Sequence, residues 1–153
     1  MIKTSLEHLN VFAGKWLTNG QQHPGPVGPA AKITAVETYE WLPGECFLIH
    51  RFEGRVGDEP AVCLEVIGRD AANEDYPVHT FYHNGMSTQW RLHERDGAWY
   101  MTGHWDIGGR RADVRCTLVF SDDGDVMAGK WEYADADHAW HTFWDVEARK
   151  VKN

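Results

Sequence analysis

Short stretches of alternating apolar and polar residues, separated by tight-turn dipeptides, constrain this chain more than any other feature of its sequence. Asn84-Gly85, Asp96-Gly97 and Asp123-Gly124 are dipeptides that readily supply the positive φ angles of two-residue hairpin turns. No helical stretch that could build a parallel crossover lies between the apolar segments, so the sequence predicts an all-β antiparallel meander of about ten strands. The expected strands are 14–21, 32–42, 46–56, 61–70, 76–83, 86–95, 98–107, 111–120, 126–133 and 140–150.

The alternation also predicts how the two edge strands of this meander are paired. One face of the last five strands is apolar and rich in aromatic residues, whereas the other carries charges such as Arg91, Arg115, Lys130 and Asp145. A period of two with one aromatic face fits a closed up-and-down barrel whose interior is filled or holds a ligand. The predicted inward residues are Met86, Thr88, Trp90, Leu92, Trp99, Met101, Gly103, Trp105, Val114, Cys116, Leu118, Phe120, Met127, Gly129, Trp131, Tyr133, Trp140, Thr142, Trp144 and Val146.

Two segments near the amino terminus do not fit the strand pattern. In "TSLEHLNVFAG", Thr4 or Ser5 is placed to cap a short helix, Leu6, Leu9 and Phe12 lie at helical spacing, and Gly14 is placed to end it. The following "QQHPGPVGPAA" holds too much proline and glycine for regular structure. We expect the helix to cover one end of the barrel and this second segment to be a flexible loop that crosses an open end or simply connects two strands.

The sequence resembles calycin-type barrels, the group that includes lipocalins, fatty-acid-binding proteins and nitrobindins, and it is most similar to bacterial domain-of-unknown-function proteins on that fold. The resemblance is carried by the opening helix with "AGKWLTNG", the "ETYEWLPGECFLIHRFEG" hairpin, the "GRD" after the fourth strand and the final "AWHTFWDVEARK". It covers almost the whole chain and implies one barrel domain over residues 1–153. It also implies that Trp16 of the first strand packs against Arg149, a cation over an aromatic face worth about 1 kcal/mol.

Composition and cysteine content exclude several classes of protein. The formal net charge is −8 and no run of Lys or Arg is present, which argues against binding to nucleic acid or to anionic membranes. Cys46, Cys63 and Cys116 are odd in number and form no C-x-x-C motif, so we expect buried free thiols rather than disulfides or a zinc site. The sequence shows no secretory signal pattern and no apolar run of membrane-spanning length, so a cytoplasmic location is expected.

Eight tryptophans are more than a soluble chain of 153 residues usually carries. Aromatic rings with an N–H or O–H group suit a cavity that binds a flat or apolar molecule and orients it by a few polar contacts. We therefore expect Trp90, Trp105, Trp131 and Trp144 to contribute to a site for a small hydrophobic or aromatic ligand. The alternative is that these tryptophans simply fill the barrel.

Histidines in the strands extend this candidate ligand site. "LIHRF" and "HTFYHN" contribute His50, His79, Tyr82 and His83, although Leu48, His50 and Phe52 compete with Phe47, Ile49 and Arg51 for the inward face. His79 and His83 would lie about 13 Å apart on a strand, too far to share one metal ion by themselves. A small-molecule enzyme that uses cavity His, Arg and Tyr residues is an alternative function, but no nucleophile and base stand at a recognisable spacing.

Haem binding and dimerisation are two further alternatives. Nitrobindin-like proteins bind haem through a histidine near the carboxyl terminus, so the resemblance makes His138 and His141 the positions to examine. The surrounding "HAWHTFWD" departs from that family, and His141 alternates away from Trp140, Thr142 and Trp144, so we expect no cofactor and no metal. A homodimeric interaction module would instead show a filled barrel with an exposed apolar face on one sheet.

Overall fold

The structure is a computed structural model that describes residues 2–152, with side chains from Ser5 onward. It contains a short helix α1 (Ile2–Glu7), a 3-10 turn η1 (His8–Val11) and ten strands. The strands are β1 (Gly14–Gln22), β2 (Ala31–Trp41), β3 (Leu48–Val56), β4 (Glu59–Ile67), β5 (Tyr76–Tyr82), β6 (Ser87–Arg95), β7 (Ala98–Ile107), β8 (Arg110–Phe120), β9 (Val126–Ala134) and β10 (Trp140–Lys150).

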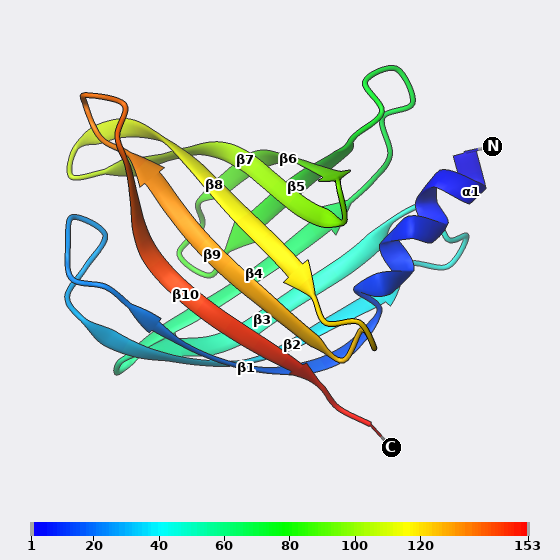
Figure 1. Cartoon of the computed structure of the whole chain (residues 1–153), viewed down its shortest axis with the longest axis horizontal. Coiled ribbons are helices and arrows are strands. Elements are labelled where there is room, and N and C mark those ends of the chain that lie inside the picture. Colours follow the sequence, from blue (N-terminus) through cyan, green and yellow to red (C-terminus); the bar gives the residue numbers. More distant parts are fainter. Residues whose placement is uncertain (1, 153) are drawn as a thin grey trace.

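The ten strands form one closed antiparallel barrel in which each strand pairs with its neighbours in sequence and β1 pairs with β10 (Figure 1). Closure pairs both edges of the meander and leaves no strand edge open to another chain. The tight turns form as predicted, because Gly85, Gly97 and Gly124 all have positive φ angles, from 76° to 89°. The predicted fold class is therefore confirmed. Among residues 2–152, no helix is long and apolar enough to cross a membrane.

The amino-terminal helix covers one end of the barrel (Figure 1). Leu6, Leu9 and Phe12 are buried against the barrel core, as the helical spacing predicts. The predicted capping residues are wrong, because the helix already begins at Ile2 and contains both Thr4 and Ser5. The segment between β1 and β2 lies at the opposite end, where Val27 packs against the core.

The predicted meeting of the two chain ends is confirmed, but its basic residue is Lys150 rather than Arg149. In the pairing of β1 with β10, Trp16 lies opposite Lys150 and Leu17 opposite Arg149. The Lys150 ammonium stands 5.2 Å from the centre of the buried Trp16 ring. Arg149 points outward, is largely exposed and forms an ion pair with Glu147 at 2.7 Å. Neighbouring residues on a strand point to opposite faces, so only one of the two can reach Trp16.

Most of the predicted inward face is buried or half-buried, but Met86 is 54% exposed, contrary to the prediction, and β10 departs from the predicted alternation. The register between β10 and β9 shifts between Thr142 and Trp144, which marks a β-bulge at Phe143. A bulge adds one residue and reverses the alternation on one side of it. Phe143 is therefore buried, whereas Trp140 and Thr142 lie on the outer side, contrary to the prediction.

Candidate functional site

The barrel encloses a cavity of about 230 Å³ that is lined by side chains from all ten strands and by Phe12. At the helix-covered end it reaches Phe12 and Tyr39, and toward the other end it reaches Pro60 and His83. A cavity of about 150 Å³ holds benzene, so this one has room for an aromatic ring with a short substituent.

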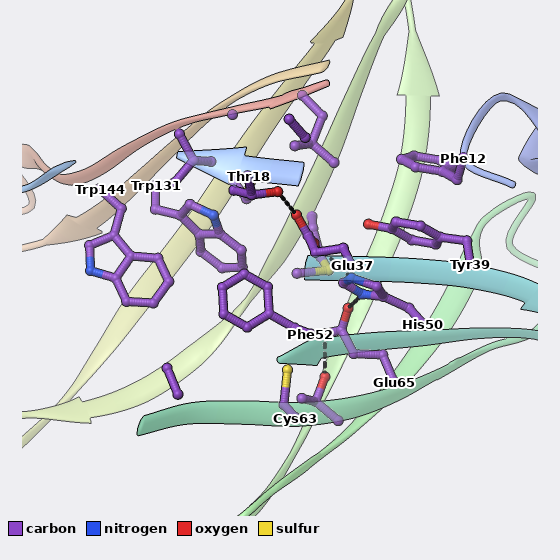
Figure 2. Close-up of a pocket in the computed structure, with 18 of the residues that line it drawn as sticks. Phe12, Thr18, Glu37, Tyr39, His50, Phe52, Cys63, Glu65, Trp131 and Trp144 are labelled. Atoms are coloured by element: carbon purple, nitrogen blue, oxygen red, sulfur yellow. Dashed lines mark hydrogen bonds and ion pairs between the residues drawn. The ribbon is translucent and has the colours of Figure 1, made fainter. Parts of the chain in front are cut away.

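A continuous row of polar side chains crosses one wall of the cavity (Figure 2). His50 lies at its centre, with Nε2 2.8 Å from Glu37 Oε1 and Nδ1 2.6 Å from Glu65 Oε1. The Thr18 hydroxyl donates to Glu37 Oε2, and the Thr80 hydroxyl donates to Glu65 Oε2 at 2.6 Å. We call Thr18, Glu37, His50, Glu65 and Thr80 the polar row. Its members come from β1, β2, β3, β4 and β5 in order.

Strand register explains why this row forms. His50 lies directly opposite Glu65, and Glu65 lies directly opposite Thr80. Directly opposed residues on one face of an antiparallel pair hold their Cβ atoms about 5 Å apart, so their side chains can hydrogen-bond. On the other side His50 is opposite Tyr39, and Glu37 reaches it from two residues earlier on β2. All five residues of the row are buried to more than 90%.

The two carboxylates keep His50 protonated. Burial by itself would lower the pKa of His50, but its hydrogen bonds to Glu37 and Glu65 and their negative charges raise that pKa to about 9. Burial likewise opposes ionisation of Glu65, yet the hydrogen bond and charge of His50 and the Thr80 hydroxyl lower its pKa. Each ring nitrogen of His50 hydrogen-bonds to one carboxylate oxygen, so the ring and the two glutamates share two protons and carry one net negative charge.

Other titratable groups around the row are held in their neutral forms. Burial, together with the charge of Glu37, raises the pKa of the Tyr39 phenol well above its usual value. Burial, followed by the charge of Glu65, also raises the pKa of the Cys63 and Cys116 thiols. Neither thiol is therefore a thiolate nucleophile near neutral pH.

The wall on the opposite side of the cavity is aromatic. Trp105 and Trp131 lie almost parallel, with ring centres 5.8 Å apart, and Trp144 meets Trp131 edge to face at 6.2 Å. Two of the three indole N–H groups have hydrogen-bond acceptors, because Trp105 Nε1 donates to the Tyr82 hydroxyl at 3.2 Å and Trp144 Nε1 donates to Gln22 Oε1 at 2.8 Å. Trp105 and Trp144 thus present mainly their apolar faces to the cavity.

The structure brings most of the predicted ligand-site residues together. Six of the eight line the cavity: Trp105, Trp131, Trp144, His50, Tyr82 and His83. Trp90 is buried behind this wall, close against Gly103, and packs edge to face on Trp105 and Trp131. His79 lies on the outside of the barrel, because inward residues of β5 are Val78, Thr80 and Tyr82.

The undecided face of β3 is now assigned. Leu48 and His50 are buried, and His50 and Phe52 line the cavity. Arg51 therefore points outward and is exposed, so it is not available as a cavity cation. No group of three or more His, Cys, Asp or Glu side chains within residues 2–152 is arranged to hold a metal ion.

The two histidines considered for haem lie outside the lining of the cavity. The bulge at Phe143 places His141 on the same side as Tyr133, not on the outer side as predicted, but His141 is half exposed. Its Nε2 is bound to Asp135 at 2.6 Å and its ring stacks on Tyr133. His138 lies in the turn after β9 with a φ angle of 65°. Neither histidine lines the cavity.

Sequence reasoning missed four members of the polar row, Thr18, Glu37, Glu65 and Thr80, and also Tyr39. A signal was present in two strands. Glu37 stands in phase with the apolar Ile33 and Ala35, and Glu65 stands in phase with Ile67. An acidic residue in the inward phase on each side of an inward histidine indicates a buried ionic network.

A solved structure with the same fold matches this chain. The crystal structure of Rv2717c from M. tuberculosis is 11% identical to this chain, with a TM-score of 0.68, and the match covers 97% of this chain and 98% of that one. A de novo designed fluorescence-activating β-barrel is 13% identical over 99% of this chain and 100% of its own, with a TM-score of 0.48. At such low identity the first likeness concerns the fold alone.

Family membership comes from the sequence match. No curated protein matches the chain. The family described as "Protein of unknown function (DUF1579)" matches residues 3–147, which is nearly the full length. This ten-stranded barrel therefore belongs to the DUF1579 family.

Proposed function

We propose that this protein is a calycin-like binding barrel that holds a small hydrophobic or aromatic molecule in its cavity. The observation that carries the proposal is a cavity of about 230 Å³ with an aromatic wall on one side and the polar row on the other. Apolar pockets with a few fixed polar groups are the usual form of small-molecule sites. The three free cysteines agree with the reducing cytoplasm that we propose as its location.

The chemistry of the cavity favours binding over catalysis. Both ring nitrogens of His50 are bound to carboxylates, so neither can accept a proton from a substrate. Burial raises the pKa of the Cys63 thiol, and that keeps the thiol from acting as a nucleophile near neutral pH. What the arrangement supplies is a fixed, charged and aromatic surface for recognition.

Native mass spectrometry of the protein purified from its own host, with an absorbance spectrum of the same sample, tests this proposal. We expect a retained small molecule whose mass is the difference between the bound and bare chain. Isothermal titration with indole, a neutral aromatic probe, is the second measurement, and we expect it to bind. A bare chain mass together with no heat from indole would overturn the proposal.

Ala61→Trp should block the cavity, because Ala61 lines it near Pro60, toward the end away from the amino-terminal helix, and a large ring there should fill it. Ala128→Trp adds the same ring on the exposed outer side of β9. We expect Ala61→Trp to lose the retained molecule and indole binding, and Ala128→Trp to keep both. Equal binding by the two variants would show that the ligand lies elsewhere.

A further inference from the structure

We infer that the ligand of this cavity is a monocation, a small organic amine or quaternary ammonium compound with an apolar or aromatic body. This inference rests on the proposed binding function and names the ligand's charge. It starts from the charges that face the cavity. Other clusters, such as the pairing of Arg91 with Asp70 and Asp75, lie on the outer surface, where water and salt screen their charges.

The polar row carries a net negative charge that the cavity does not balance. Each of the two hydrogen bonds between His50 and a glutamate needs one proton, and a neutral histidine supplies only one. The three side chains therefore hold one further proton. Their net charge is −1 whether Glu37, His50 or Glu65 carries it. Among the described residues that line the cavity, none is Lys or Arg. A buried charge without a partner is costly, and a cationic ligand is the group that would balance it.

The carboxylates can accept this ligand without losing their present bonds. Each oxygen of Glu37 and Glu65 accepts one hydrogen bond, from His50 or from a threonine. An ionised carboxylate has about four acceptor positions, so about two remain on each glutamate. Both side chains line the cavity, and their small exposed fractions, 7% for Glu37 and 8% for Glu65, lie in it.

The aromatic wall suits the same class of ligand. Faces of tryptophan and phenylalanine rings attract organic cations, and the attraction is stronger where water is excluded. Trp105, Trp131 and Trp144 line the cavity, and Phe52 extends into it toward them (Figure 2). An ammonium group beside the glutamates would leave the rest of the molecule against these rings. An anion of the same shape should bind more weakly, because the negative polar row and the electron-rich ring faces repel it.

Three probes of nearly equal shape and different charge test the inference: 2-phenylethylamine, 2-phenylethanol and phenylacetate. Isothermal titration at about pH 6 keeps the amine protonated and the carboxylate ionised. We expect the amine to bind about tenfold more tightly than the alcohol, which is the scale of a modest charge interaction, and phenylacetate to bind most weakly. Equal affinities for amine and alcohol, or no binding of the amine at millimolar concentration, would overturn the inference.

Glu37→Gln is the informative variant, because it removes one negative charge and retains the side-chain shape. At about pH 6 the remaining Glu65 keeps His50 protonated, so the row becomes neutral. We expect the preference for amine over alcohol to disappear while the alcohol still binds. Glu53→Gln removes the same charge from the exposed outer side of β3 and should leave the preference intact.

The outcomes separate this inference from the proposed function. If indole binds, and 2-phenylethanol binds with the same affinity as 2-phenylethylamine, the proposed binding function is supported and only the preference for a cation is overturned. If Glu37→Gln fails to fold, the ranking of the three probes on the unmodified protein still decides the inference. If Glu37→Gln retains the preference for the amine over the alcohol and Glu53→Gln loses it, the amine binds at the outer surface, which would contradict the inference.

Discussion

Tyr39 lies flat on the imidazole of His50, with ring centres 3.9 Å apart and planes only 2° apart. The two residues face each other across the β2–β3 pair, so the backbone register holds this stack in place. Glu37 and Glu65 bind the two edges of the same imidazole. His50 is therefore held by Tyr39 on one ring face and by a glutamate at each ring nitrogen. Its protonated form makes both hydrogen bonds and so stabilises the barrel.

The stability of the protein should decrease at alkaline pH because of His50. Its folded-state pKa of about 9 lies above the value of an unfolded histidine, about 6.5. A raised pKa of this kind adds stability that is fully present below about pH 6.5 and is lost as the pH rises through about 9. Urea unfolding midpoints between pH 7 and 10 should show this loss, and an NMR titration of the His50 ring should report the pKa directly.

His50→Gln should flatten that pH dependence, whereas His93→Gln, an outer-side change on β6, should leave it unchanged. If His50→Gln is too unstable to study, the ring titration remains. A His50 midpoint near 6.5 would contradict the proposed charge state of the polar row.

Thr80→Val should destabilise the barrel by about 1–3 kcal/mol, because a buried carboxylate loses one hydrogen-bond donor. Thr80 is fully buried and its hydroxyl donates to Glu65 at 2.6 Å. Valine has nearly the same shape, so packing should change little. Thr102→Val, on the exposed outer side of β7, is the control and should shift the unfolding midpoint by much less. Equal effects would show that the hydroxyl of Thr80 contributes nothing specific.

Lys150→Met should lower stability by about 0.5–1 kcal/mol through loss of the cation over the Trp16 ring. Arg149→Met should have a smaller effect, because its exposed ion pair with Glu147 contributes little. Chemical denaturation of both variants compares the two residues directly. A larger loss for Arg149→Met would restore the pairing that the family resemblance implies.

Gly103→Ala should destabilise the protein by about 1–3 kcal/mol through overpacking. A Cβ atom at this position would lie 2.5 Å from the Trp90 ring, which is buried and cannot easily move. Gly25→Ala is the matched control, since a Cβ atom there meets nothing within 4 Å and the φ angle is not positive. Thermal unfolding should separate the two variants, and similar midpoints would mean that Trp90 shifts freely.

The polar row shows where prediction from sequence stopped. His50 was a candidate, but Glu37 and Glu65 were not, because an acidic residue in an alternating strand is ordinarily a solvent-facing one. Their proximity depends on the register of three strands, and register is a property of the pairing. The same holds for Trp16, whose basic partner shifted by one residue because β1 and β10 pair in a register that places Lys150 beside it.

Sequence alone determined the all-β class, the hairpin turns, the barrel closure and most of the inward face, because these follow from local backbone preferences and a period of two. Tertiary structure decided the bulge at Phe143, the inward face of β3 and the joining of five side chains into one charged row. These features depend on which residues face each other across strands, and that is settled only when the whole barrel closes and buries its side chains together.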